Sequence, residues 1–451
     1  MLTARRSLAL VLLLAGPADL ALAQTWTLLA PASSPSARNR HEMATLPNGR
    51  VLLFGGRSGG GASLGDSWLW DGSSSAWTQV NVSPSPSPRA GHGMAFDANR
   101  NVTVAFSGWS GNNYLPDTWE FDGSSWANVT PSSSPPGRDW PGMAYDPLTQ
   151  SVLLTGGHDF NDFIAGIGAF DDMWSFDGVA WTQLTPAVKP PRRAGHRMVY
   201  DPNSGKVILL GGSTTGVGLY NDMWAWDGTT WTQLHPATLP PPRNYFSLVW
   251  DAGRGRVVLH GGNSSGAALT DTWEWDGVDW TQTGTTGPGR WFNGMAYDPS
   301  GDRVIHFGGM SSASPVVDDA ETRSYVGPSP DWANLGHDLA GAGGAPKLVG
   351  TGALAGGSVV SLNLTNAAPN ATANLIVGFT NLSAPFFGGT LVPSPNVIAA
   401  LPSGPTGSLN LLTTFPAGVA PGFPIHVQYW IVDPTGPQGY TASNALVGVT
   451  Q

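Results

Sequence analysis

One phrase recurs along the chain and sets what the chain can fold into. The pattern D-x-W-x-[WF]-D-G begins at Asp66, Asp117, Asp172, Asp222 and Asp271. A glycine doublet precedes it, ending at Gly56, Gly157, Gly212 and Gly262, with a further doublet at Gly309 and a Ser-Gly pair at Gly108. A tryptophan follows it, at Trp77, Trp126, Trp181, Trp231 and Trp280. Three markers in phase, with a period of roughly 50 residues, indicate a repeat architecture built from one supersecondary unit.

The strands of one unit can be located by their alternation. Residues 196–201 (HRMVYD) alternate, 202–205 (PNSG) form a turn, and 206–212 (KVILLGG) are almost continuously apolar. Residues 222–228 (DMWAWDG) alternate again and end in an Asp-Gly pair, which is typical of a tight hairpin turn. Residues 229–234 (TTWTQL) form the return strand. Four strands in each unit predict the blade of a β-propeller.

The tryptophans are expected to be the core of this propeller. Trp224 and Trp226 are two residues apart, so in a strand both point to the same face. A single blade cannot bury both of its faces, but stacked blades can, and wide aromatic side chains fill the space between them. The sequence contains no cysteine, so this aromatic layer has to stabilise the fold without disulfides.

The doublets predict six blades, and the chain ends suggest how the ring closes. Residues 26–29 (WTLL) resemble a return strand with no unit before it, and residues 318–325 (DDAETRSY) resemble a degenerate middle strand of the sixth unit. If these pair, the two ends share one blade, which is the closure we expect. In the alternative, residues 331–333 (DWA) supply the last return strand and Trp26 is left over.

Composition divides the rest of the chain. Residues 1–23 have the basic start, apolar centre and small-residue end of a secretory signal peptide, which predicts a secreted, extracellular or periplasmic protein. We assign 24–335 to the propeller, 336–346 to a linker and 347–451 to a small β-sandwich. Charged residues make up 12% and the net charge is −10, so nothing favours nucleic acid or membrane insertion. We expect a monomer.

The doublet, the variable loop after it and the later aromatic resemble the kelch repeat over about 26–335, and the central domain of galactose oxidase is one such propeller. The resemblance implies that arginines near the start of each first strand face a ligand pocket. The copper cofactor of that oxidase needs a cysteine, so it cannot form here, and we predict no cofactor. The end of the chain (VDPTGPQGYTASNALVGVT) is similar to C-terminal β-domains of exported planctomycete-type proteins.

Six arginines occupy one column of the repeat, just before each first strand. One interpretation makes them a ring that binds carboxylate or sulfate groups, because a guanidinium fork suits these acceptors. The other makes each arginine a brace for the aspartate of the D-x-W phrase. The last unit lacks that phrase, so its arginine could be unpaired. The column is Arg38, Arg89, Arg138, Arg193, Arg243 and Arg290.

Residues beside this column and in two long loops complete the candidate ligand-binding site. Trp140, Tyr245 and Trp291 follow their arginines by one or two residues and could stack on sugar rings. The loops after the glycine doublets vary between units; 158–170 is the longest and 109–116 is another, and long variable loops on a rigid scaffold often carry function. They contribute Trp109, His158 and Asp159. Three column histidines, His41, His92 and His196, lack metal-site spacing, so no metal is predicted.

These features support three functional hypotheses. The first is a binding protein for a carbohydrate, an acidic ligand or a protein partner at the channel face. The second is an extracellular sugar-active enzyme, similar to a mutarotase or isomerase, although no nucleophile or phosphate-loop motif is present and no catalytic residue is predicted. The third is a structural surface or matrix protein.

Overall fold

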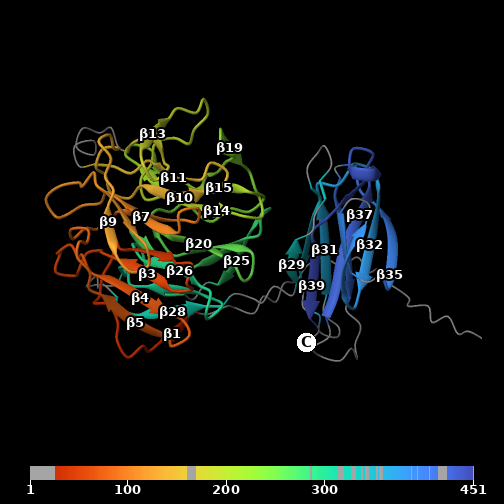
Figure 1. Cartoon of the computed structure of the whole chain (residues 1–451), viewed down its shortest axis with the longest axis horizontal. Coiled ribbons are helices and arrows are strands. Elements are labelled where there is room, and N and C mark those ends of the chain that lie inside the picture. The colour runs from red at the N-terminus through yellow and green to blue at the C-terminus, as the bar shows by residue number, and fades with distance from the viewer. Residues whose placement is uncertain are drawn as a thin grey trace, which may run out of the picture. The chain divides into compact units, whose positions relative to one another are not determined.

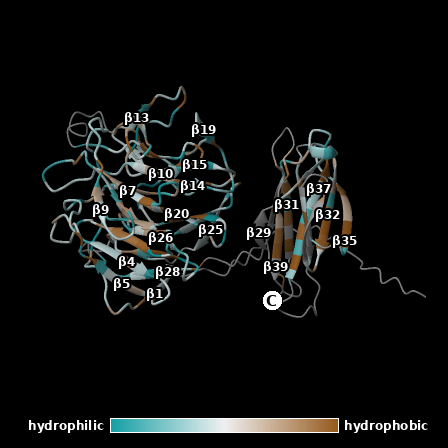
Figure 2. Cartoon of the chain, viewed as in Figure 1, coloured by the Kyte–Doolittle hydropathy of each residue, from teal (hydrophilic) through white to brown (hydrophobic). Residues whose placement is uncertain are grey.

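Among the residues that the structure describes, the regular elements are β-strands apart from one short 3-10 helix, and the chain divides into two units between Gly327 and Pro328. The structure is a computed structural model (Figure 1). It describes residues 26–159, 169–284, 287–312, 319–326, 332–336, 339–340, 345–351, 354, 359–386, 389–393, 395–405, 407–414 and 424–449. Figure 2 shows that hydrophobic residues gather on the strands of both units, while many loops are hydrophilic.

The first unit is a ring of six four-stranded antiparallel sheets, here numbered as blades 1–6. In each blade the first strand is innermost, because the six first strands contact one another around a closed circle. The strands of blades 1 to 3 are β2 (Glu42–Thr45), β3 (Val51–Phe54), β4 (Ser67–Asp71) and β5 (Ala76–Val80); β6 (Gly93–Asp97), β7 (Val102–Phe106), β8 (Thr118–Phe121) and β9 (Trp126–Asn128); and β10 (Gly142–Asp146), β11 (Ser151–Thr155), β12 (Met173–Phe176) and β13 (Trp181–Leu184).

Blades 4 and 5 each carry an additional two-stranded hairpin after the glycine doublet, and blade 6 joins the two ends of the unit. Their strands are β14 (Arg197–Asp201), β15 (Lys206–Leu210), β18 (Met223–Trp226) and β19 (Trp231–Leu234), with the hairpin β16 (Ser213–Thr214) and β17 (Gly218–Leu219); β20 (Ser247–Asp251), β21 (Arg256–His260), β24 (Thr272–Trp275) and β25 (Trp280–Gly284), with the hairpin β22 (Asn263–Ser264) and β23 (Ala267–Ala268); and β26 (Gly294–Asp298), β27 (Arg303–Phe307), β28 (Thr322–Tyr325) and β1 (Thr27–Leu29).

The ring closes through the N-terminal strand, as expected from the sequence. β1 pairs antiparallel with β28, with Leu28 opposite Arg323. Trp26 is 7% exposed, and its indole donates a 3.0 Å hydrogen bond to Thr272 of the preceding blade. Its ring also packs on His260 and Tyr325, with centroids 4.6 Å and 5.1 Å away. The first segment of the described chain therefore completes the last blade.

The tryptophan-rich phrase is explained by contacts between blades. The tryptophan of each return strand is buried and donates its indole N–H to the residue that follows the D-x-W aspartate position in the preceding blade. Trp126, for example, bonds Ser67 at 2.9 Å, and Trp181 bonds Thr118 at 2.9 Å. Because buried indole N–H groups need an acceptor, each of these residues both fills the space between blades and fixes their alignment.

The second unit is a β-sandwich with its own core. One sheet has the order β29-β39-β37-β32-β35, with β38 beside β37, and another has the order β30-β31-β36. Leu348, Leu364, Leu375 and Tyr429, from both sheets, pack in one buried cluster. The elements are β29 (Trp332–Gly336), β30 (Lys347–Thr351), β31 (Val359–Thr365), β32 (Thr372–Gly378), β33 (Asn381–Phe386), β34 (Gly389–Pro393), β35 (Val397–Pro402), β36 (Leu409–Thr414), β37 (Pro424–Val432), η1 (Pro437–Gly439), β38 (Tyr440–Ala442) and β39 (Ala445–Val449).

This unit begins before the linker that composition suggested. β29 pairs with β39, so Trp332 lies opposite Gly448 and belongs to the sandwich. The alternative in which residues 331–333 close the propeller is therefore wrong. Leu339, inside the segment 336–346, makes backbone hydrogen bonds with Ala442; 337–338 and 341–344 lie outside the described residues, as does the signal-peptide segment 1–23.

Candidate functional site: the central channel

Five arginines of the column are buried braces. Arg38, Arg89, Arg138, Arg193 and Arg243 are at most 2% exposed. Each forms a bidentate ion pair with the D-x-W aspartate of its own blade, donates to the carbonyl of the first residue of the doublet, and donates from Nε to a carbonyl two residues earlier. The structure thus places these guanidinium groups as the bracing interpretation expects, and no ligand can reach them without displacing an aspartate.

The sixth arginine is also paired, so the expectation that it could be free is wrong. Arg290 donates from Nε and Nη2 to one carboxylate oxygen of Asp319, at 2.9 Å and 2.7 Å. Asp319 stands two residues before Glu321, whose carbonyl occupies the place held by the D-x-W aspartate carbonyl in the other blades. The partner of Arg290 therefore stands two residues earlier than the D-x-W pattern would place it, so the pattern does not mark it. Arg290 is more exposed than the others, at 18% of its side chain.

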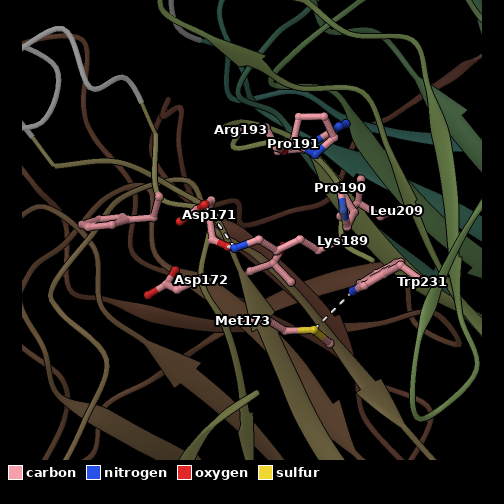
Figure 3. Close-up of a pocket in the computed structure, with 12 residues that line it drawn as sticks. Asp171, Asp172, Met173, Lys189, Pro190, Pro191, Arg193, Leu209 and Trp231 are labelled. Atoms are coloured by element: carbon pink, nitrogen blue, oxygen red, sulfur yellow. Dashed lines mark hydrogen bonds and ion pairs between the residues drawn. The ribbon is translucent and has the colours of Figure 1, made fainter. Parts of the chain in front are cut away.

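The space for a ligand beside the arginine column is small, as a crevice between blades 3 and 4 shows. Its volume is about 20 Å³, and Arg193, Trp231 and Lys189 lie around it (Figure 3). Lys189 reaches across to the carboxylate of Asp171 at 3.1 Å. A space of this size holds about one water molecule, so it cannot take a sugar ring or a side chain.

The residues two positions after each arginine are joined in a ring by their backbones. Each donates its backbone N–H to the carbonyl of the equivalent residue in the preceding blade, at 2.7–3.1 Å, and the six bonds close a circle. Every one of them has a positive φ, between 50° and 67°. We call these residues the inner ring: Arg40, Gly91, Trp140, Gly195, Tyr245 and Phe292.

The side chains of the inner ring pack across this end of the channel. Trp140 and Phe292 are stacked, with centroids 5.1 Å apart and planes at 20°. The Arg40 guanidinium lies 4.9 Å from the first ring and 4.7 Å from the second, and Tyr245 packs on both. Gly195 makes space for Tyr245, since a Cβ there would lie 2.6 Å from its ring. Trp140 and Tyr245, two of the aromatic residues predicted to bind a ligand, therefore meet here, but their side chains pack on each other.

The remaining predicted residues lie around the same end. Trp291 is half-buried and stacks on Phe292, with centroids 5.1 Å apart. In blade 2, the ring centroids of Trp109 and Tyr114 are 4.8 Å apart, and the backbone of Trp109 pairs with that of Ala90. Trp109, Tyr114 and Trp291 are each half-buried, whereas Phe292 is 6% exposed.

His158 forms an ion pair with Asp139, with Nδ1 2.7 Å from Oδ1. Burial opposes the charge on His158, but the hydrogen bond and charge of Asp139 raise its pKa above the ordinary value. Burial also raises the pKa of Asp139. Asp159 adds a weaker favourable charge to His158, and the rest of its loop, 160–168, lies outside the described residues.

The column histidines are core residues. His41, His92 and His196 are at most 1% exposed, and burial lowers their pKa values, that of His92 to about 3. They are therefore neutral near pH 7 and lie between blades, where His196 bonds Thr155 at 2.9 Å. In the described part of the chain, no group of three or more His, Cys, Asp or Glu side chains is placed to hold a metal ion.

Below the inner ring, an ion pair spans the channel. Glu42 begins β2 of blade 1 and Arg197 begins β14 of blade 4, so they come from opposite sides of a six-bladed ring. Arg197 Nη1 is 2.6 Å from Glu42 Oε1, and its Nε donates to the Phe246 carbonyl at 2.8 Å. Burial raises the pKa of Glu42, and Arg197 opposes that shift.

This pair borders a small polar chamber of about 70 Å³. The opposite side of the chamber is a ring of thioether and aliphatic side chains, one from each innermost strand, which we call the methionine ring. They interleave with small residues of the neighbouring blade: a Cβ on Gly294, for example, would lie 2.8 Å from the sulfur of Met43. The methionine ring consists of Met43, Met94, Met143, Met198, Leu248 and Met295.

Beyond the methionine ring the channel widens into an open cavity of about 480 Å³, which we call the funnel. The methionine ring forms its floor, and alanine and valine side chains form its wall. Its outer part is lined by aromatic residues of the innermost strands, and by residues of the turns that follow them, such as Pro202 and Ala252. The aromatic residues are Phe96, Tyr145, Tyr200, Trp250 and Tyr297.

The sequence predictions missed the funnel because they concentrated on the arginine end. A signal for it was present, since the segments GMAFD, GMAYD, RMVYD, SLVWD and GMAYD repeat a methionine or leucine and an aromatic two residues apart. Repeated in a ring, such positions line the channel. Glu42 and Arg197 also stand out, as the charged residues in a column otherwise filled by glycine and serine.

Comparison with known families supports this architecture. The KLHDC2/KLHL20/DRC7 kelch-repeats domain matches residues 19–187, a range that includes every strand of blades 1 to 3. The fold is a six-bladed kelch-type β-propeller. Kelch repeats generally mediate protein binding, and this is the functional class that the similarity supports. No helix in the described residues is long and apolar enough to cross a membrane.

Proposed function

We propose that the protein is an exported binding module that holds a partner protein at the funnel end of its channel. The observation that carries the proposal is the funnel itself: an open, mainly apolar cavity of about 480 Å³ with a ring of aromatic residues in its outer part. Its volume is typical of ligand sites, which range over about 300–1,000 Å³. Aromatic and methionine side chains are also those that protein interfaces favour.

The surroundings of the funnel suit a protein more than an acidic ligand. The arginines that would bind an acid are already paired inside the blades. Leu148, on the turn after β10, is 60% exposed, and Val179, on the hairpin turn of blade 3, is 79% exposed. The two kinds of turn lie on one face, since Gly228 of such a hairpin turn approaches Leu148. Exposed apolar groups beside an apolar cavity are typical of an interaction surface.

A carbohydrate is the second candidate, at the other end of the channel. There the half-buried rings of Trp140 and Trp291 could stack on a sugar, with the Asp139–His158 pair beside them. A sugar-active enzyme would use this same end. Retention on sulfated or uronic-acid glycans would favour it.

The test is a paired screen of the mature chain, against displayed random peptides and against a glycan array. We expect enrichment of peptides with apolar and aromatic residues, whose binding persists in salt. A blank peptide screen combined with a clear glycan hit would move the function to the aromatic end, and two blank screens with a folded protein would favour a structural role. N-terminal sequencing of the exported protein should begin at Gln24, which tests the export signal.

A further inference from the structure

The polar chamber lies on the other side of the methionine ring from the funnel. It is bordered by an ion pair, whereas no charged residue lines the funnel. Glu42 and Arg197 meet there through one oxygen and one nitrogen, with an Oε1–Nη1 distance of 2.6 Å. Among the described residues, no donor bonds Oε2 of Glu42 and no acceptor bonds Nη2 of Arg197. The pair therefore presents one hydrogen-bond acceptor and one donor side by side at the wall of the chamber.

The methionine ring lies between the funnel and this pair. The same six side chains line both cavities. Methionine has three rotatable bonds and a polarizable sulfur, so a ring of five methionines can adjust around a slender group. Leu248 is more exposed than the five methionines, which makes its position the easiest point of passage.

From this arrangement we infer that the chamber receives the carboxamide end of an apolar stem, such as an asparagine or glutamine side chain that the partner inserts through the methionine ring. The inference rests on the proposed function of the funnel. A primary amide can donate N–H to the free oxygen of Glu42 and accept from the free nitrogen of Arg197 at the same time. Its stem would contact the sulfur atoms and aromatic rings above.

Charged end groups fit less well. A carboxylate could bond Arg197 but would stand beside the carboxylate of Glu42, and like charges at this distance repel strongly away from bulk water. An ammonium group would meet the guanidinium in the same way. A plain alkyl end would leave both polar groups buried without partners, which costs about 1–3 kcal/mol for each group.

The probes are hexanamide and hexanoate, which differ only in the end group. Each is titrated into the full mature chain carrying methyl-labelled methionine. Five of the nine methionines in the sequence lie in the methionine ring. Met173 and Met223, which accept indole N–H groups between blades, report on the rest of the fold. We expect hexanamide to shift the ring methyl signals saturably, to leave these two unchanged, and to bind at least about tenfold more tightly than hexanoate.

Two variants sharpen the test. Glu42→Gln removes the negative charge and should reverse the preference, so that hexanoate binds more tightly than hexanamide. Leu248→Phe should narrow the passage and weaken hexanamide binding, whereas Leu248→Met, of matched size, should preserve it. The second pair keeps the inference testable if Glu42→Gln does not fold.

The possible outcomes distinguish a failure of this inference from a failure of the proposed function. Equal binding of the two probes, or ring methyl signals that hexanamide does not move, would overturn the inference. If selected peptides still bound at the funnel in that case, the proposed function would stand without the carboxamide site. If neither the peptides nor the probes bound, both would fail.

Discussion

The arginine column offers the sharpest test of how the blades are held, and Arg138→Ala is the decisive substitution. Arg138 is fully buried, and it bonds both carboxylate oxygens of Asp172, at 2.6 Å and 2.8 Å. It also donates to the carbonyls of Gly156 and Pro136, at 2.8 Å and 3.1 Å. The alanine variant would leave Asp172, whose side chain is only 15% exposed, without its counter-charge.

Removing one partner of a buried pair typically costs about 3–5 kcal/mol, which is the loss we expect in the free energy of unfolding. The matched control is Lys189→Ala in the same blade region. Lys189 and Asp171 are 43% and 48% exposed, so that pair should contribute no more than about 1 kcal/mol. Removing both charges, in Arg138→Ala with Asp172→Ala, should cost less than the sum of the single substitutions.

Urea unfolding of the mature chain, followed by tryptophan fluorescence, measures these differences, because the indoles lie mainly between the blades. The propeller transition is analysed separately from that of the sandwich. The reasoning would be refuted if Arg138→Ala unfolded within about 0.5 kcal/mol of the unmodified protein, or lost no more than Lys189→Ala. In that event the arginines would be free to serve a ligand.

Other predictions concern the closure, the inner ring and pH. Trp26→Ala should lower the free energy of unfolding by about 3–5 kcal/mol in the same urea assay, because the indole fills the last blade interface. Gly195→Ala should destabilise the protein and alter the near-ultraviolet dichroism of the aromatic cluster, since a Cβ there meets Tyr245 at a positive φ of 67°. Burial lowers the pKa of His92 to about 3 and that of His260 to about 4. Below about pH 6.5 the unfolded chain binds these protons, and the folded chain does not. Each histidine should therefore reduce the free energy of unfolding by about 2 kcal/mol between pH 7 and pH 5. A free energy of unfolding that stayed constant over that window would contradict their burial as neutral groups.

Much of the fold could be predicted because a repeat reports the same structure several times. The D-x-W phrase, the doublet and the return-strand tryptophan fix four strands per unit, and Trp26 supplied the missing strand of the last one. The departures arise where the chain breaks its own pattern. Asp319 is displaced along the sequence, and Trp332 resembles a return strand but pairs with β39. Local sequence does not specify such long-range pairings.

The site was harder to predict because repetition does not show which end of a channel is open. The arginines form a ring in sequence, but their buried ion pairs depend on a partner 28 to 34 residues away. Whether an aromatic side chain such as Trp140 faces solvent or packs on its neighbours depends on all six blades together. The Glu42–Arg197 pair was recoverable, since blades three apart face each other in a six-bladed ring.

The most direct test of the account is the affinity of a selected peptide for two valine variants. Val249 lies on the funnel wall, whereas Val217 is 68% exposed in the hairpin between β16 and β17, beside the arginine column. We predict that Val249→Glu weakens binding by about 100-fold or more, in line with a charge placed against an apolar contact, while Val217→Glu changes it less than about threefold, with both variants measured well below their melting temperatures. Equal affinity for the two variants would contradict the claim that the funnel is the binding site.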